Sequence, residues 1–306
     1  MSILSKTYFH DEAAAFDYLE SILWPDGAHC PHCGVIGRSN KMQGKSHRIG
    51  LWKCYACRKQ FTVKVGTVFE HGRIPLHKML QAVYLMTSSK KGISAHQLHR
   101  TLEITYKSAW FLAHRIREAM REGDFDGGLG GENKVVEADE TYVGGKAKNR
   151  AYKAPPKKEP VVALVEREGK VRSFHMPSVT AKNLRPVLVT QIDRKSFLMT
   201  DEAKVYRGAG REYAGHGTVN HSINEYVRHG GFMHTNTVEG YFSILKRGIT
   251  GVFQHVSQQH LKRYLGEFDF RYNTRSALGF DDAKRSVEAL RGVVGKRLTY
   301  KSCPTA

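Results

Sequence analysis

Residues 134–145 read KVVEADETYVGG, and this stretch indicates the core of the fold. Two valines lead into acidic residues and then into Tyr142, Val143 and a glycine pair. A run rich in β-branched residues and bounded by glycine is typical of a β-strand. The sequence therefore places the carboxylate of Asp139 on or just after a strand.

Two later stretches are suited to meet this carboxylate. Residues 197–201, FLMTD, form an apolar run that ends in Asp201, and residues 235–247, TNTVEGYFSILKR, open a helix that carries Glu239. Carboxylates are hard oxygen ligands of the kind that Mg²⁺ prefers, and Mn²⁺ accepts the same ligands. Two such ions, held side by side, stabilise the attacking and leaving oxygens of a phosphoryl transfer. We therefore expect Asp139, Asp201 and Glu239 to hold two Mg²⁺ or Mn²⁺ ions.

The helix that begins near Glu239 also carries cationic side chains. Lys246 and Arg247 follow about two helical turns later, where they would contact a phosphate backbone. Taken alone, each acid is explained as well by a solvated carboxylate, and Glu239 by a favourable interaction with the helix dipole. It is the combination of the three acids that predicts a catalytic site.

The composition favours a polyanionic partner. The 306 residues include 48 Lys and Arg against 29 Asp and Glu, which gives a formal net charge of +19. Nucleic acid is the first candidate for such a charge, and an acidic membrane surface is the second. No apolar run approaches the roughly 20 residues that span a bilayer, and no signal peptide is apparent. We expect a cytoplasmic protein with no membrane partner.

The cysteines indicate a metal site. Four of the five form two Cys-x-x-Cys pairs about twenty residues apart, namely Cys30 with Cys33 and Cys54 with Cys57. This spacing is typical of a zinc ribbon, and four thiolates fill the tetrahedral shell of one structural Zn²⁺. A redox pair is the alternative. We assign residues 26–70 to the ribbon and residues 1–25 to a helical segment before it.

Residues 71–126 predict a DNA-binding helix-turn-helix. A helix capped by Ser94 ends near Leu102, and a second helix runs from Tyr106 through Met120 after a three-residue break. The second helix would enter the major groove, although an ordinary helical hairpin has the same pattern. The candidate DNA-binding residues of this helix are Tyr106, Lys107, Ser108, His114, Arg115 and Arg117, and Arg247 is added from the later helix.

Residues 127–295 predict an α/β domain with a mixed sheet. Strands are expected at 134–143, 160–165, 170–174 and 196–199, with a helix at 180–191 before the last of them. Residues 219–227 have no clear pattern, and helices at 258–272 and 281–290 close the domain. Residues 296–306 form a tail.

The motifs resemble those of the IS1595 family (ISXO2-like), a branch of the DDE transposases with a ribonuclease H-like core. The resemblance rests on DETYVGG at 139–145, TDE at 200–202 and HTNTVEGYFSILKRG at 234–248. It extends to RYL at 263–265 and FRYN at 270–273, and the family also has an N-terminal zinc ribbon and helix-turn-helix.

This resemblance implies a catalytic set of Asp139, Asp201, Glu239 and Lys246, with Asn236 as an alternative third position. The adjacent acids at 137, 140 and 202 are second choices, because strand alternation is expected to point them away from the site. The resemblance also implies Mg²⁺-dependent cleavage at terminal inverted repeats and joining to target DNA. It implies a homo-oligomer on double-stranded DNA, associated with a bacterial nucleoid. A catalytically silent DNA-binding regulator and a nuclease with the same core are the alternatives.

Overall fold

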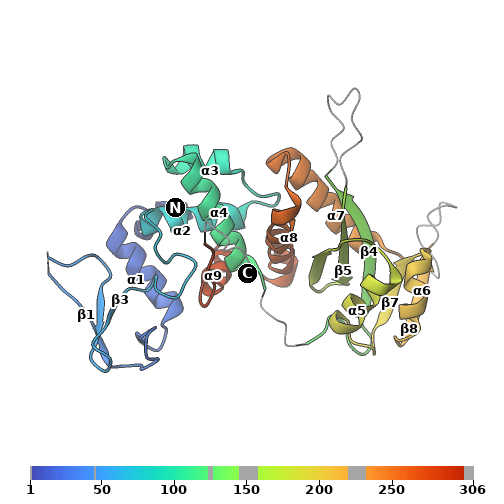
Figure 1. Ribbon diagram of the computed structural model, residues 1–306, viewed down its shortest axis with the longest axis horizontal. Helices are drawn as coiled ribbons and strands as arrows, with labels where there is room; N and C mark the ends of the chain where they lie inside the picture. Colours follow the sequence, from blue (N-terminus) through green and yellow to red (C-terminus); the bar gives the residue numbers. More distant parts are fainter. Residues whose placement is uncertain (1, 45, 123–126, 145–157, 220–231, 300–306) are drawn as a thin grey trace, which may run out of the picture. The chain divides into compact units, whose positions relative to one another are not determined.

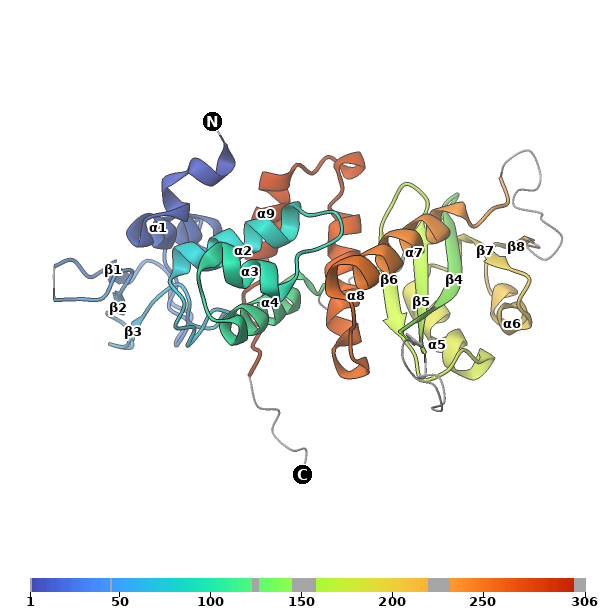
Figure 2. The same cartoon turned by 90° about the horizontal axis from the view of Figure 1, so that it is seen from above.

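The computed structural model describes residues 2–44, 46–122, 127–144, 158–219 and 232–299, which form two compact units (Figures 1 and 2). The first unit combines residues 2–122 with residues 280–299, and the second unit is formed by residues 127–279. The last part of the expected tail, with Cys303, lies outside the described residues. No helix in the described ranges is long and apolar enough to cross a membrane.

Helices make up most of the first unit. Their bounds are η1 (Ile3–Ser5), η2 (Thr7–Phe9), α1 (Glu12–Leu23), α2 (Leu76–Ser88), α3 (Ala95–Leu102), α4 (Tyr106–Met120) and α9 (Asp282–Arg291). Helix α9 packs against α1, α2 and α4, and it buries Ala289 and Leu290. The sequence grouped α9 with the α/β domain, whereas its apolar face is covered by helices of the first unit.

A small three-stranded antiparallel sheet forms the ribbon. It consists of β1 (Ser39–Lys41), β2 (Trp52–Cys54) and β3 (Gln60–Phe61). Helix α1 is tied to it through Glu20, which accepts hydrogen bonds from Trp52 Nε1 and Lys41 Nζ, both at 2.9 Å. These bonds satisfy a carboxylate that lies almost wholly out of water.

The four cysteines converge at one end of this sheet. Their sulfur atoms all lie within 4.8 Å of one another, with Cys30 and Cys57 at 3.6 Å and Cys33 and Cys54 at 3.8 Å. A tetrahedron of sulfurs about 2.3 Å from a central Zn²⁺ has edges of about 3.8 Å. The cluster therefore fits one structural zinc ion.

The second unit is built on a five-stranded mixed sheet with the strand order β6-β5-β4-β7-β8. Its strands are β4 (Val135–Val143), β5 (Glu159–Glu166), β6 (Val171–His175), β7 (Phe197–Asp201) and β8 (Gly215–Val219). Strands β4, β5 and β6 pair antiparallel, whereas β4 with β7 and β7 with β8 pair parallel. The expected mixed sheet is thus confirmed, but β8 was missed, because its sequence, GHGTV, is short and rich in glycine.

Helices cover both faces of this sheet (Figure 1). One core contains Val161 and Ala163 of β5 beneath α7 (Asn236–Gly248) and α8 (Gln258–Asn273). The other contains Ala138 of β4 beneath α5 (Ala181–Gln191) and α6 (Arg207–Gly210). The turns of this unit are η3 (Lys204–Tyr206), the π-helix η5 (Ile249–Phe253) and η6 (Ser276–Leu278).

Helix α8 also covers the outer edge of β6. Asn273 accepts a hydrogen bond from Val171 N at 2.7 Å and donates one to Val171 O at 3.0 Å. One helical turn earlier, Asp269 accepts from Ser173 N at 2.9 Å and from Ser173 Oγ at 2.7 Å. Backbone groups at a strand edge that would otherwise face solvent or another strand are therefore satisfied by side chains of α8.

The ribbon yields a prediction about metal content and folding. We expect about one Zn²⁺ per chain by metal analysis, and Cys54→Ser to lose it, because three thiolates and a hydroxyl bind zinc more weakly. Since zinc binding supplies folding free energy, residues 26–61 of this variant should become sensitive to proteolysis. Cysteine 303 provides the control, and Cys303→Ser should retain the metal. A folded, protease-resistant ribbon without metal would contradict the assignment.

Candidate active site

The parallel pairing of β4 with β7 brings two of the three candidate acids together. Glu137 pairs with Met199, and two residues further along both strands Asp139 comes beside Asp201. Asp139 is also paired with Ala163 of β5, which packs beneath α7 and α8. Because paired residues share a face, both aspartates lie on the α7 face of the sheet.

The third acid, Glu239, comes from the first turn of α7 on the same face. The hydroxyl of Thr235, the residue before the helix, donates to Glu239 Oε1 at 3.2 Å. Lys246 follows Glu239 by seven residues, so it lies on the same side of the helix, and both side chains are exposed. Arg247 donates to Ser243 within the helix and is exposed as well.

The pKa of Asp139 is raised by burial and by the neighbouring acids. Burial raises the pKa of Asp139 to about 7, although a hydrogen bond from Glu140 N to Asp139 Oδ1, at 2.7 Å, opposes the increase. The negative charges of Glu140, Asp201 and Glu239 raise this pKa further. A half-buried carboxylate surrounded by acids is a place where a cation would relieve repulsion.

The three acids do not converge as tightly as the four cysteines. Within the described ranges, only the four cysteines place their ligand atoms all within 4.8 Å of one another. A pair of Mg²⁺ ions needs no such tight cluster. Asp139, Asp201 and Glu239 would instead hold Mg²⁺ as a few carboxylate ligands, with water and substrate phosphate supplying the remaining oxygens.

The neighbouring acids divide between the two faces of the sheet. Glu140 points to the opposite face, where it accepts a 2.5 Å hydrogen bond from the buried Tyr206 hydroxyl. The expectation for Glu140 is therefore confirmed. The expectation for Glu137 is wrong, because alternation has a period of two and Glu137 shares the face of Asp139. It is fully buried and contacts the start of α7.

Glu137 and its partner Arg167 are thus buried neighbours of the acids that were not predicted from the sequence. Arg167 Nε donates to Glu137 Oε1 at 2.6 Å. Glu137 precedes Asp139 by two residues, so strand alternation places both on one face, and this spacing could have identified Glu137 from the sequence. Arg167, in the turn after β5, had no comparable signal, because its role depends on the pairing of β5 with β4.

The helix-turn-helix segment has the expected form. Ser94 accepts a hydrogen bond from Gln97 N at 3.1 Å, and Glu103 ends α3 in the left-handed conformation with φ 51°. Thr105 then caps α4 by accepting from Ser108 N at 3.2 Å. Tyr106, at the start of α4, is 43% exposed and stacks on His96 with ring centroids 4.3 Å apart.

The cationic residues of α4 are not equally accessible. Lys107 is exposed, and Arg115 is half-buried with its guanidinium 4.7 Å from the Phe111 ring. Arg117 is only 2% exposed, and His114 is also buried. Arg117 and His114 are therefore removed from the candidate DNA-binding residues, because their side chains face the helical core and not solvent.

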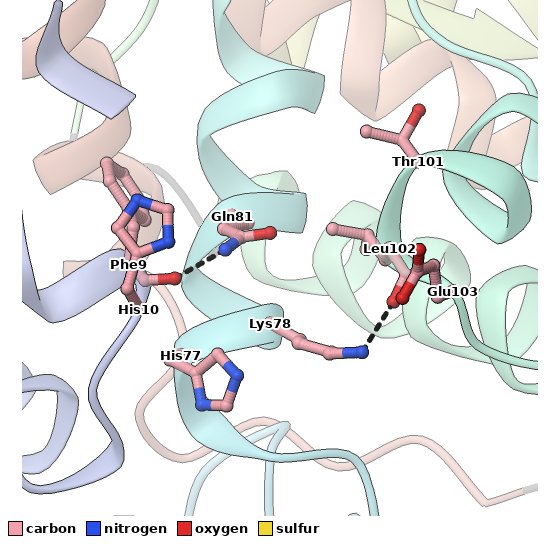
Figure 3. A pocket seen from close by; sticks show the side chains of 8 residues that line it. All are labelled: Phe9, His10, His77, Lys78, Gln81, Thr101, Leu102 and Glu103. Atoms are coloured by element: carbon pink, nitrogen blue, oxygen red, sulfur yellow. Dashed lines mark hydrogen bonds between the residues drawn. The ribbon is translucent and has the colours of Figure 1, made fainter. Parts of the chain in front are cut away.

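The first unit has a surface pocket lined by residues of η2, α2 and α3 and of the turns that follow η2 and α3 (Figure 3). Its volume, about 240 Å³, is below the roughly 300–1,000 Å³ of typical ligand sites. Two of its polar side chains are engaged with the protein: Lys78 Nζ donates to Leu102 O at 2.8 Å, and Gln81 donates to Phe9 O. These contacts explain the pocket as part of the packing of α2 against its neighbours.

Comparison with known proteins identifies the two parts of the chain. A profile described as the transposase zinc-ribbon domain matches residues 10–60, and one described as the ISXO2-like transposase domain of IS1595 matches residues 128–273. An uncharacterized protein in transposable element ISH50 of Halobacterium salinarum is 27% identical over 289 residues, which cover 87% of this chain and 92% of the relative.

Among solved structures, a chain of the simian T-cell lymphotropic virus intasome in complex with PP2A regulatory subunit B56 gamma aligns with a TM-score of 0.28. It is 16% identical, over 56% of this chain and 67% of that chain. The Halobacterium relative is archaeal, so the similarity extends beyond the bacterial setting expected from the sequence. From the two matched profiles, this chain belongs to the IS1595 family of transposases, with a transposase zinc ribbon before its ISXO2-like domain.

Proposed function

We propose that this protein cuts DNA at the ends of an insertion sequence and joins the freed 3′-hydroxyl ends to target DNA. The observation that carries the proposal is the arrangement of Asp139 and Asp201 on adjacent parallel strands, facing the helix that carries Glu239. We interpret the five-stranded sheet beneath them as the ribonuclease H-like core expected from the family resemblance.

The three acids fit a pair of Mg²⁺ or Mn²⁺ ions in ligand type and in charge. When bound, such ions would activate water or a 3′-hydroxyl and stabilise charge on the scissile phosphate. The protein holds the acids on two strands and one helix, so the ligands are fixed by packed elements and not by loops. Lys246, exposed on the same side of α7 as Glu239, would contact the DNA backbone.

Recognition of the terminal inverted repeats is assigned to the first unit. Helix α4 presents Tyr106 and Lys107 at its exposed N-terminal end, the part of a recognition helix that contacts base edges. Ser108 and Arg115 remain candidates for contacts along the same helix. We further propose that two copies assemble on DNA, because joining both ends of an element requires that the ends be paired.

The catalytic role of the acids is tested with purified protein, Mg²⁺ and labelled duplexes that carry the inverted repeats flanking the gene. Asp201→Asn and Asp139→Asn should lose at least about 10³-fold in cleavage, since each removes a charged metal ligand, yet bind the duplex normally. Cleavage retained in either variant would contradict the metal assignment. Cleavage without joining by the wild type indicates a nuclease, and binding without cleavage indicates a silent regulator.

The role of α4 is tested by salt-dependent binding to the same duplex. Lys107→Ala should weaken binding and reduce the slope of log K against log salt by about 1, because one phosphate contact is lost. Lys182→Ala is the matched control, since Lys182 is exposed on α5, on the face of the sheet opposite the acids. Equal effects of the two substitutions would argue against groove binding by α4.

The raised pKa of Asp139 predicts a pH-dependent stability. Between pH 4 and pH 7 the folded protein binds more protons at Asp139 than the unfolded chain, so the free energy of unfolding falls as pH rises. Asp139→Asn should remove this pH dependence. The variant should be more stable than the wild type by on the order of 3 kcal/mol above pH 7, and this difference should disappear near pH 4. Denaturant melts without added Mg²⁺ provide the measurement. A difference independent of pH would contradict this electrostatic interpretation.

A further inference from the structure

Glu137 is a buried carboxylate that accepts three hydrogen bonds from the first turn of α7. Its carboxylate accepts from Thr237 N at 2.8 Å, Val238 N at 3.0 Å and Thr237 Oγ1 at 2.9 Å. These two backbone N–H groups belong to the first turn of α7, where the helix leaves such donors without partners. The side chain of a strand residue thus caps a helix whose first turn, at Thr237, lies 100 residues later in the chain.

Arg167 completes this arrangement from the other side. Its Nε donates to Glu137 at 2.6 Å, while its two terminal nitrogens donate to Phe232 O at 2.7 Å and His234 O at 2.9 Å. The same guanidinium therefore neutralises the buried carboxylate and binds the backbone that leads into α7. Planar guanidinium groups are suited to hold several acceptors in fixed directions.

The position of this contact relative to the acids gives it a functional meaning. Glu137 and Asp139 lie two residues apart on one face of β4, about 7 Å along the strand. On α7, Val238, whose N–H contacts Glu137, is directly followed by Glu239. The contact with Glu137 therefore holds the backbone next to Glu239 against the strand that carries Asp139.

We propose that Glu137, held by Arg167, is a positioning residue that fixes the first turn of α7 so that Glu239 completes the metal site. This inference rests on the proposed function, because it concerns the same three acids. A carboxylate suits this position, because the Arg167 guanidinium, the Thr237 hydroxyl and two backbone N–H groups donate to it. His234 Nδ1 also lies 3.1 Å from Glu137 Oε1 and can donate when it carries a proton. The amide of a glutamine would direct its own N–H groups at one or more of these donors.

The test measures Mn²⁺ binding to the wild type and its variants. Only the binding that is lost in Asp139→Asn is attributed to the site of the three acids. Glu137→Gln should weaken this binding by at least about tenfold, the loss typical when a group that orients a metal ligand is removed. Hydrogen exchange at Thr237 and Val238 should accelerate in the same variant. Asn273→Ala is the control for stability, because Asn273 ties α8 to β6, which is two strands away from β4 in the same sheet.

The outcomes are distinguishable. Weaker Mn²⁺ binding in Glu137→Gln, with wild-type affinity in an Asn273→Ala protein of comparable thermal stability, supports the positioning role. Unchanged affinity in Glu137→Gln, or an equal loss in both variants, overturns it. A wild-type protein that binds Mn²⁺ but does not cleave DNA contradicts only the proposed reaction. A wild type without Asp139-dependent Mn²⁺ binding contradicts the metal site and the inference together, before any Glu137 variant is made.

Discussion

The parallel pairing between β4 and β7 is the constraint on which the second unit depends. It determines the face on which every side chain of these central strands lies, because a shift of one residue would exchange the two faces. In the observed register, Val136 and Leu198 enter the core beneath α5, while Asp139 and Asp201 meet on the α7 side. The packing of the core and the meeting of the acids therefore follow from the same hydrogen bonds.

The carboxylates on this face differ in how far the protein compensates their negative charge. Glu137 receives an arginine, a hydroxyl and two backbone N–H groups, so its charge is compensated within the protein. Asp139 receives one backbone N–H and stands among other acids, so much of its charge remains uncompensated. A fold retains such repulsion where a ligand from outside supplies the missing charge, and functional sites commonly hold it at a cost in stability.

Much of the chain could be predicted because its local signals agree with its tertiary structure. The Cys-x-x-Cys pairs, the capped helices α3 and α4, and the apolar strands β4, β5 and β7 all carry strong patterns over short distances. The failures have a common cause. The strand β8, the burial of Arg117 and the packing of α9 depend on residues distant in the chain, as does the contact of Glu137 with α7. Local sequence carries little information about such neighbours.

The cover that α8 places over β6 also limits how copies of this protein can associate. Asp269 and Asn273 occupy backbone groups at that edge, so a strand from another molecule cannot add to the sheet there without displacing two side-chain bridges. Sheet extension at β6 is thus closed as a route to self-association. Copies that assemble on DNA would therefore meet through surfaces other than this edge, such as the β8 edge of the sheet or the helices that cover its faces.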